Sequence, residues 1–143
     1  MENNSNNLPL IELTSSYDIY AAHQLRRPEW PESKNREIFG QCADLHGHQY
    51  KLVVVLEGRI QQDSGMIVNG YEMDRIVKEK VLAIIDHKFI NEADIFFKEH
   101  LTTVEWIACW IFGKLKNEFP PHCRLKTIQV YETPALYAVY SGS

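Results

Sequence analysis

The sequence contains too few cysteines for a disulfide scaffold. Only three occur among its 143 residues, Cys42, Cys109 and Cys123, and three thiols cannot all pair. Their irregular spacing is also unlike the framework of a small secreted protein. We therefore expect reduced thiols, each of which is either a small buried hydrophobic residue or a reactive group.

Long apolar runs and an excess of positive charge are absent as well. Charged residues interrupt every hydrophobic stretch well before the roughly 20 residues that a membrane-spanning helix needs. No secretory signal precedes the first expected strand. The 15 Lys and Arg residues are outnumbered by 19 Asp and Glu, so the net charge of -4 gives no general attraction to nucleic acid or anionic membranes. We expect a cytoplasmic protein that binds neither.

The length and composition fit one domain. A chain of 143 residues that is 45% hydrophobic can bury a substantial core, whereas two domains would be cramped. Residues 1–7 are almost wholly polar and rich in asparagine, so we expect a flexible tail without chemistry. Residues 8–143 are expected to form the single domain.

Hydrophobic periodicity predicts several strands and two helices. Strand-like apolar runs recur along the chain, while three- and four-residue steps between apolar residues mark the helices. The expected order is one or two strands over 8–22, a long loop or short helix over 26–40, a strand over 49–57, helices over 69–85 and 101–119, and strands over 125–132 and 135–141. Because no β-α-β alternation occurs, the expected fold class is α+β with a mainly antiparallel sheet.

The second expected helix has a start signal and an unusually apolar surface. Thr102 and Glu105 have the spacing of a capping box, with Thr102 as the N-cap. Trp106, Cys109 and Trp110 lie off the main apolar stripe, which makes the first turns apolar nearly all round. We expect another subunit to cover this second side.

His46 and His48 flank a single glycine where a strand is expected to begin. Side chains two residues apart in a strand share a face, so both imidazoles can bind one ion. His23 ends the first strand region, and Cys42 lies four residues before His46. Three imidazoles with a nearby thiol suit a catalytic zinc site, which keeps its fourth position open. The alternative interpretation is two polar residues at the start of a strand.

Cys42, Asp86 and His87 are candidates for proton transfer. A nearby cation lowers the pKa of a thiol, so Cys42 is either a base or nucleophile or an ordinary loop cysteine. Asp86 and His87 close the first helix. An imidazole there is favoured by the helix dipole, and the alternative is a carboxylate–imidazole pair that moves protons near neutral pH.

Glu132 ends a strand that is otherwise apolar and β-branched. A carboxylate in this position can accept two parallel hydrogen bonds from a guanidine-like edge, and the alternative is a solvent-exposed turn residue. Glu105 is explained by its capping box. We interpret His100 and His122 as surface residues.

Short motifs follow one another in a fixed order from about residue 11 to 141. They are Ala21-Ala22-His23, Cys42-x3-His46-Gly47-His48-x-Tyr50, Gly65-Met66, Asp86-His87, Thr103-x-Glu105, Glu132-Thr133 and a closing Tyr140. In order and spacing they resemble the 6-pyruvoyltetrahydropterin synthase and 6-carboxytetrahydropterin synthase family. The resemblance implies the tunnelling fold, in which a four-stranded antiparallel sheet carries two helices on one face. It also implies a homohexamer of two stacked trimers with active sites at the subunit junctions.

The resemblance also assigns roles to individual residues. The implied zinc ligands are His23, His46 and His48. The implied proton-transfer group is Cys42, Asp86 and His87. Glu132 would anchor the pterin ring through its 2-amino and N3 edge, helped by Thr103 and Glu105.

The implied activity is that of a triphosphate-eliminating lyase acting on 7,8-dihydroneopterin triphosphate. Zinc would act as a Lewis acid that makes the C–H protons of the substrate's side chain more acidic. Our leading hypothesis is a 6-carboxytetrahydropterin synthase of queuosine biosynthesis, which releases acetaldehyde, because the three-residue gap between Cys42 and His46 resembles the bacterial enzymes. Asn69 and the long segment 26–40 favour the alternative, a 6-pyruvoyltetrahydropterin synthase of tetrahydrobiopterin biosynthesis.

A noncatalytic, zinc-stabilised assembly module is an alternative of another class. Structural zinc sites normally fill all four positions with protein ligands. Cys42 as a close fourth ligand would favour that interpretation over an open catalytic site.

Overall fold

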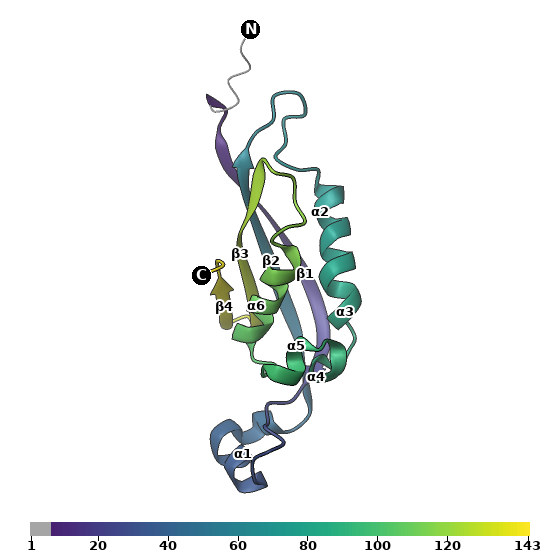
Figure 1. The fold of residues 1–143 in the computed structure, drawn as a ribbon, viewed down its shortest axis with the longest axis vertical. Helices are drawn as coiled ribbons and strands as arrows, with labels where there is room; N and C mark the ends of the chain where they lie inside the picture. The colour runs from purple at the N-terminus through teal and green to yellow at the C-terminus, as the bar shows by residue number, and fades with distance from the viewer. Residues whose placement is uncertain (1–6) are drawn as a thin grey trace.

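Four strands form one antiparallel sheet in the computed structural model, which describes residues 7–143 (Figure 1). Their order across the sheet follows the sequence: β1 (Leu10–His23), β2 (His46–Arg59), β3 (Cys123–Thr133) and β4 (Leu136–Tyr140). The expected α+β class with a four-stranded antiparallel sheet is therefore confirmed. The tail expected over residues 1–7 lies, apart from Asn7, outside the described residues.

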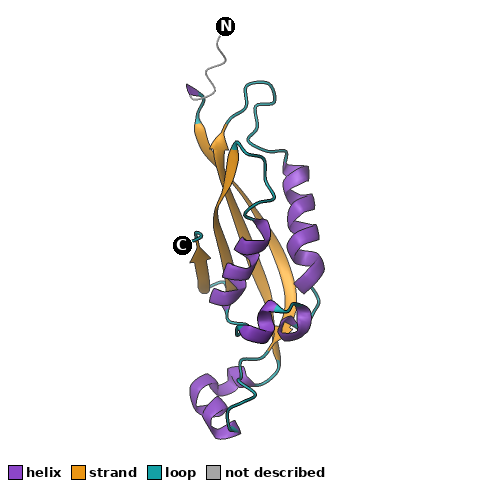
Figure 2. Cartoon of the chain, viewed as in Figure 1, coloured by secondary structure: helices purple, strands orange, loops and turns teal. Residues whose placement is uncertain are grey.

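Two helices cover one face of this sheet (Figure 2). The first runs without a break through α2 (Gly70–Val77), a π-helical turn (Lys78–Leu82) and α3 (Ala83–Ile85), and the second is α6 (Val104–Leu115). Alternate side chains of β2 belong to the core beneath these helices, each at most 1% exposed: Tyr50, Leu52, Val54 and Leu56. The expected pair of helices on one face is confirmed.

Strand β1 is one continuous strand. Ser15 and Ser16, where the sequence allowed a break, pair with Val54 and Val53 of β2. A partner strand of equal length supplies backbone hydrogen bonds along all of β1, so two serines do not end it. The strand consequently reaches His23.

The N-cap of α6 is Thr103, so the prediction of Thr102 was wrong. Thr103 Oγ1 accepts a hydrogen bond from the backbone N–H of Trp106 at 3.3 Å. Glu105 is then the second helical residue, and the spacing of a capping box is lost.

Thr102 instead belongs to the interior. It is completely buried, and its hydroxyl lies 3.3 Å from both the Gln24 carbonyl and Asn91 Oδ1. These partners are distant in the sequence, which is why local spacing assigned the hydroxyl to the helix end.

Two short helices that the sequence did not predict, α4 (Ile90–Ala93) and α5 (Phe96–Glu99), lie between α3 and α6. Phe97 of α5 packs against Trp110, with ring centroids 5.4 Å apart. The same subunit thus covers the side of α6 at Trp110, and the expectation that another subunit covers it was wrong there. Trp106 is 41% exposed.

The segment between β1 and β2, residues 24–45, projects from one end of the sheet and is called the arm here (Figure 1). It contains α1 (Glu32–Phe39) and a 3₁₀ turn (Gly40–Ala43), so the short helix allowed over 26–40 is present. The buried Asn35 side chain accepts a hydrogen bond from Arg27 N at 2.8 Å and donates one to Arg27 O at 2.9 Å. This clamp holds α1 against the start of the arm.

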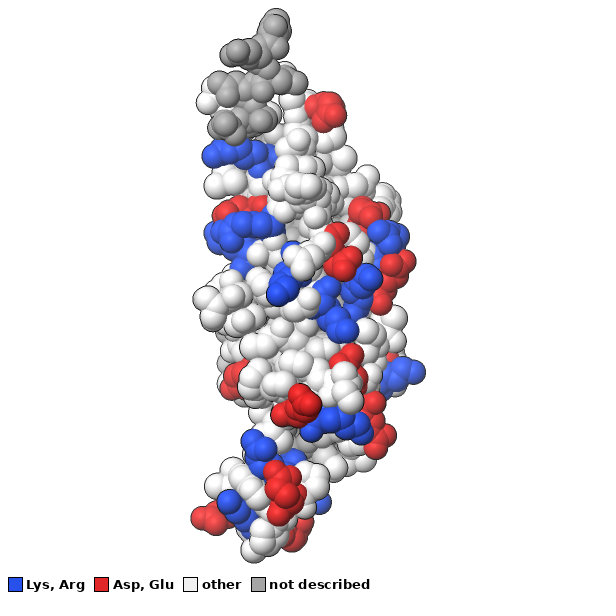
Figure 3. Space-filling model, in the orientation of Figure 1, with Lys and Arg blue, Asp and Glu red and all other residues white. Residues whose placement is uncertain are grey.

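Positive and negative side chains lie interspersed over the face drawn in Figure 3. That face offers no extended basic surface of the kind that phosphate backbones require. Within residues 7–143, no helix is both long enough and apolar enough to cross a membrane.

Candidate metal centre

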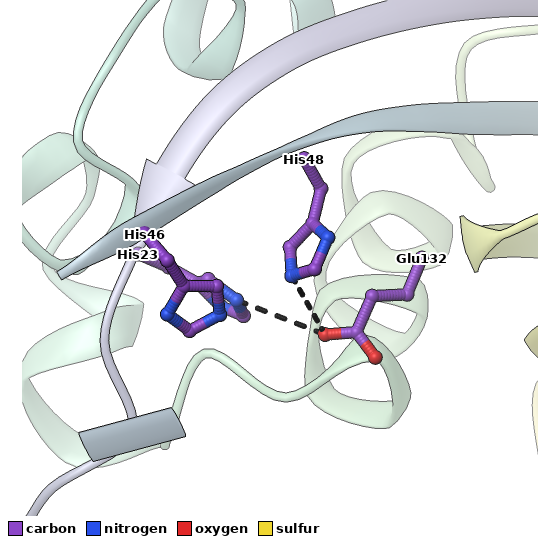
Figure 4. Close-up of side chains that lie close together, drawn as sticks. All are labelled: His23, His46, His48 and Glu132. Atoms are coloured by element: carbon purple, nitrogen blue, oxygen red, sulfur yellow. Dashed lines mark ion pairs between the residues drawn. The ribbon is translucent and has the colours of Figure 1, made fainter. Parts of the chain in front are cut away.

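Three histidines meet at the end of the sheet from which the arm projects (Figure 4). His23 closes β1 and pairs directly with His46, the first residue of β2, while His48 follows two residues later on the same face. The ring centroids of His23 and His46 are 4.4 Å apart, and those of His46 and His48 are 4.9 Å apart. The antiparallel register therefore unites side chains that the arm separates in the sequence.

Backbone carbonyls orient two of the rings. His23 Nδ1 lies 2.8 Å from the Thr102 carbonyl, and His46 Nδ1 lies 2.7 Å from the Asp44 carbonyl. A carbonyl only accepts, so each Nδ1 carries the proton and each Nε2 presents a lone pair. Such partners fix the tautomer of metal-binding histidines.

Glu132 brings a carboxylate to the histidines. Its Oε1 lies 3.4 Å from His48 Nε2 and 3.7 Å from His23 Nε2, as Figure 4 shows. The register of β3 against β4 shifts between Tyr131 and Thr133, so Glu132 stands at a bulge. Bulges re-aim side chains next to active sites, and sequence patterns do not reveal them.

Burial keeps the imidazoles neutral. It is the main cause that lowers the pKa of His23 to about 4, and the charges of His46 and His48 lower it further. Burial also lowers the pKa of His48, against the opposing effect of the Glu132 charge. Metal binding requires deprotonated imidazole, so both rings are prepared as ligands near neutral pH.

The cluster of His23, His46, His48 and Glu132 fits a metal ion. One ligating atom from each residue lies within 4.8 Å of all the others. Among the described residues, His23 Nε2 and His48 Nε2 are buried without a hydrogen-bond partner. Buried polar atoms are rarely left unpaired, and three imidazoles with one carboxylate are a donor set that zinc accepts.

Cys42 does not belong to this cluster within residues 7–143. It is exposed on the 3₁₀ turn of the arm, and its backbone carbonyl accepts a hydrogen bond from Leu25 N at 2.7 Å. The arrangement that would favour a structural site, with this thiol as a close fourth ligand, is therefore not seen in the part of the protein that the structure describes.

Asp86 and His87 form a pair at the edge of β1. Asp86 Oδ1 accepts a hydrogen bond from Tyr20 N at 3.0 Å and lies 3.1 Å from His87 Nδ1. His87 has a φ of 60°, a conformation uncommon for non-glycine residues, and its N–H donates to the Tyr20 carbonyl at 2.6 Å. Tyr20 alternates with the buried residues of β1, so its side chain, 5.7 Å from the His87 ring, faces away from His23.

The N-terminus of α6 begins beside the histidines, because the Thr102 carbonyl holds His23. Thr103 is therefore next to the cluster, with its hydroxyl already serving as the helix cap. Glu105 is exposed in the first turn of the helix and is not part of the cluster.

Sequence reasoning missed two residues that support the site. Thr102 orients His23, and Asn91 accepts hydrogen bonds from Gln24 N at 3.1 Å and from the Thr102 hydroxyl. Asn91 lies in a short helix without hydrophobic periodicity, so no local pattern marked it. Thr102 was noticed, but in the role of a helix cap.

The fold defines a class of protein. The chain superposes on the solved structure of Caenorhabditis elegans 6-pyruvoyl tetrahydropterin synthase with a TM-score of 0.88 and 30% sequence identity. The superposition covers 95% of this chain and 98% of that one. The architecture is thus that of the tetrahydropterin synthases.

The family follows from sequence. A model of the 6-pyruvoyl tetrahydropterin synthase family matches residues 12–143, and the chain belongs to this family. It is 31% identical to the 6-pyruvoyl tetrahydrobiopterin synthase of Dictyostelium discoideum, over 92% of this chain and 96% of that one, and 31% identical to that of Homo sapiens, over 85% of each. The 6-carboxy-5,6,7,8-tetrahydropterin synthase of Bacillus subtilis is 30% identical, over 91% of this chain and 84% of that one. The resemblance inferred from the motifs is confirmed.

Proposed function

We propose that this protein is a zinc-dependent 6-pyruvoyltetrahydropterin synthase that acts on 7,8-dihydroneopterin triphosphate. The observation that carries the proposal is the cluster of neutral histidines and one carboxylate, in a protein of this family. Relatives named as 6-pyruvoyl enzymes match it along most of their length and favour the pyruvoyl product over the 6-carboxy product of our leading sequence hypothesis.

In this proposal the metal is held by His23, His46 and His48, with Thr102 and Asp44 fixing two of the rings. A bound zinc ion supplies Lewis acidity toward the side-chain oxygens of the substrate. Near the cluster, the Glu132 carboxylate accepts two parallel hydrogen bonds from the 2-amino and N3 edge of the pterin. Thr103 and Glu105, at the start of α6, would help to position the ring.

Proton transfer is assigned to Cys42, Asp86 and His87. Asp86 lies against His87 Nδ1 and orients the imidazole, which leaves Nε2 to exchange a proton. Among residues 7–143, these three side chains form no group whose reactive atoms lie within 4.8 Å of one another. We infer that a neighbouring subunit completes the site, in a homohexamer of two trimers.

A 6-carboxytetrahydropterin synthase is the second candidate. The three-residue gap between Cys42 and His46 favours it, and so does the match to the Bacillus subtilis enzyme. Both activities release triphosphate. They differ because the 6-carboxy enzyme adds water across the bond between the two carbonyls of the substrate's side chain, leaving a carboxylate on the ring and releasing acetaldehyde.

Product analysis tests the proposal. Purified, zinc-loaded protein incubated with 7,8-dihydroneopterin triphosphate should release triphosphate and give 6-pyruvoyltetrahydropterin without acetaldehyde. Stoichiometric acetaldehyde would establish the second candidate instead. Absence of triphosphate release from an oligomeric, zinc-loaded sample would favour the noncatalytic module. Cys42→Ala protein is the control, because it should keep the metal and the oligomer and lose turnover.

A further inference from the structure

We propose that Glu132 is a fourth metal ligand before substrate binds, and that it leaves the metal to hold the pterin ring. The carboxylate would then control access to the metal. This inference rests on the proposed function, because it needs both the metal and a pterin ligand. It assigns to one side chain two successive partners at the same site.

The distances around Glu132 Oε1 suit a shared ion better than a direct hydrogen bond. A hydrogen bond between a ring nitrogen and a carboxylate has a length of about 2.7–3.2 Å. Oε1 is 3.4 Å from His48 Nε2 and 3.7 Å from His23 Nε2. Nitrogen and oxygen ligands of a tetrahedral zinc ion, each bound at about 2.0–2.1 Å, lie about 3.4 Å apart. Oε1 is therefore spaced as the fourth corner of a tetrahedron.

The two roles of Glu132 compete for the same oxygen atoms. Holding the guanidine-like edge of a pterin takes both carboxylate oxygens, one for each of two parallel hydrogen bonds. An Oε1 bound to the metal is a weaker acceptor, so full pterin recognition requires its release. The release opens a metal position when a substrate is present to occupy it.

The surroundings of Glu132 give it a second place to go. The same side chain lines a cavity of about 660 Å³ with residues of β1, β2 and β3, among them Asp18, Lys51 and Tyr131. Binding cavities for small molecules measure roughly 300–1,000 Å³, so this one can take a pterin ring. Glu132 is 18% exposed, whereas His23 is completely buried. The carboxylate thus lies between the histidines and an open cavity.

The metal test compares two carboxylates that line this cavity. Glu132→Gln should weaken zinc binding at least about tenfold, measured by competition with a chromogenic chelator. Asp18→Asn is the matched control, because it removes a carboxylate from the same cavity but none from the histidine cluster. Its zinc affinity should stay within about twofold of the original. Equal affinities for the three proteins would overturn the assignment of Glu132 as a ligand.

The release test uses the unaltered protein loaded with Co²⁺, whose visible absorption reports its ligands. Adding bare pterin should shift this spectrum while pterin binding is followed independently by its fluorescence. The Glu132→Gln protein should show no such shift. Pterin binding that leaves the wild-type spectrum unchanged would overturn the release and leave the proposed function intact. Failure of pterin to bind at millimolar concentration would overturn both.

Discussion

At the scale of single residues, burial sets the chemistry of the site. His23 is wholly enclosed, and its lowered pKa keeps it a neutral ligand at any pH above about 4. The spacing of His46 and His48 on one strand face was predictable, because alternation along a strand is local. The approach of Glu132 to these rings was not predictable, since it depends on a bulge in β3 and on pairing between distant strands.

The same physics acts on Tyr17, far from the histidines. Burial and a 2.6 Å hydrogen bond to Asp74 raise its pKa to about 12. The unfolded protein ionises this phenol near pH 10, so its contribution to stability is complete below pH 10 and disappears as the pH rises toward 12. The loss should amount to roughly 2–3 kcal/mol in the free energy of unfolding.

Urea unfolding between pH 8 and 11.5 checks this prediction. The Tyr17→Phe protein should lose stability less steeply with pH than the original. Tyr71→Phe is the control, because Tyr71 is 89% exposed and should leave the slope unchanged. Parallel pH profiles for Tyr17→Phe and the original protein would contradict the assigned pKa shift.

At the scale of elements, the strands and long helices followed from hydrophobic periodicity, but their ends did not. The helix predicted over 69–85 is present, with Asn69 as its cap, whereas the cap of α6 was misplaced by one residue. The short helices α4 and α5 escaped prediction because four residues are too few to show a period. Element ends depend on tertiary partners, as the buried hydroxyl of Thr102 illustrates.

Gly58 provides a test of packing between elements. It pairs with Cys123 where β3 begins, and a Cβ added there would lie 2.8 Å from both Cys123 Cβ and the His122 carbonyl. Backbone atoms cannot move away without disturbing the ladder, so Gly58→Ala should destabilise the protein by about 1–3 kcal/mol. Chemical denaturation of the metal-free protein measures the change.

Gly113→Ala is the matched control for Gly58→Ala. Gly113 is exposed within α6, and an added Cβ would meet no atom within 4 Å. Alanine is the better helix former, so this variant should gain up to about 1 kcal/mol. A Gly58→Ala protein as stable as Gly113→Ala would show that the approach of β3 is looser than described.

At the scale of the whole molecule, the protein has features of a subunit. Strands β1 and β4 are the two edges of the sheet, and Leu10, Leu136 and Val139 on them are each more than half exposed. Unpaired edges with apolar side chains favour association between copies. The sequence predicted this assembly by resemblance only, because periodicity within one subunit does not encode a partner.

Mixed oligomers test whether active sites are shared between subunits. Cys42→Ala and His87→Ala proteins should each be inactive alone. If each site takes Cys42 from one subunit and His87 from another, random co-assembly should restore about a quarter of the sites. Co-expression with two different affinity tags, sequential purification and a turnover assay provide the measurement.

Co-assembly of Cys42→Ala with Cys42→Ser is the control for this experiment, because no site can then recover the thiol. An inactive mixture of Cys42→Ala and His87→Ala, with normal oligomer mass, would mean that each subunit supplies its whole proton-transfer group.

The pairing of His23 with His46 has one more consequence. These two residues are the last of β1 and the first of β2, and the whole arm lies between them. A bound ion would join the two ends of the arm as a covalent cross-link does, and closing a segment in this way removes conformational freedom from all of it. Loading the metal therefore also limits the range of positions open to α1 and to the thiol of Cys42.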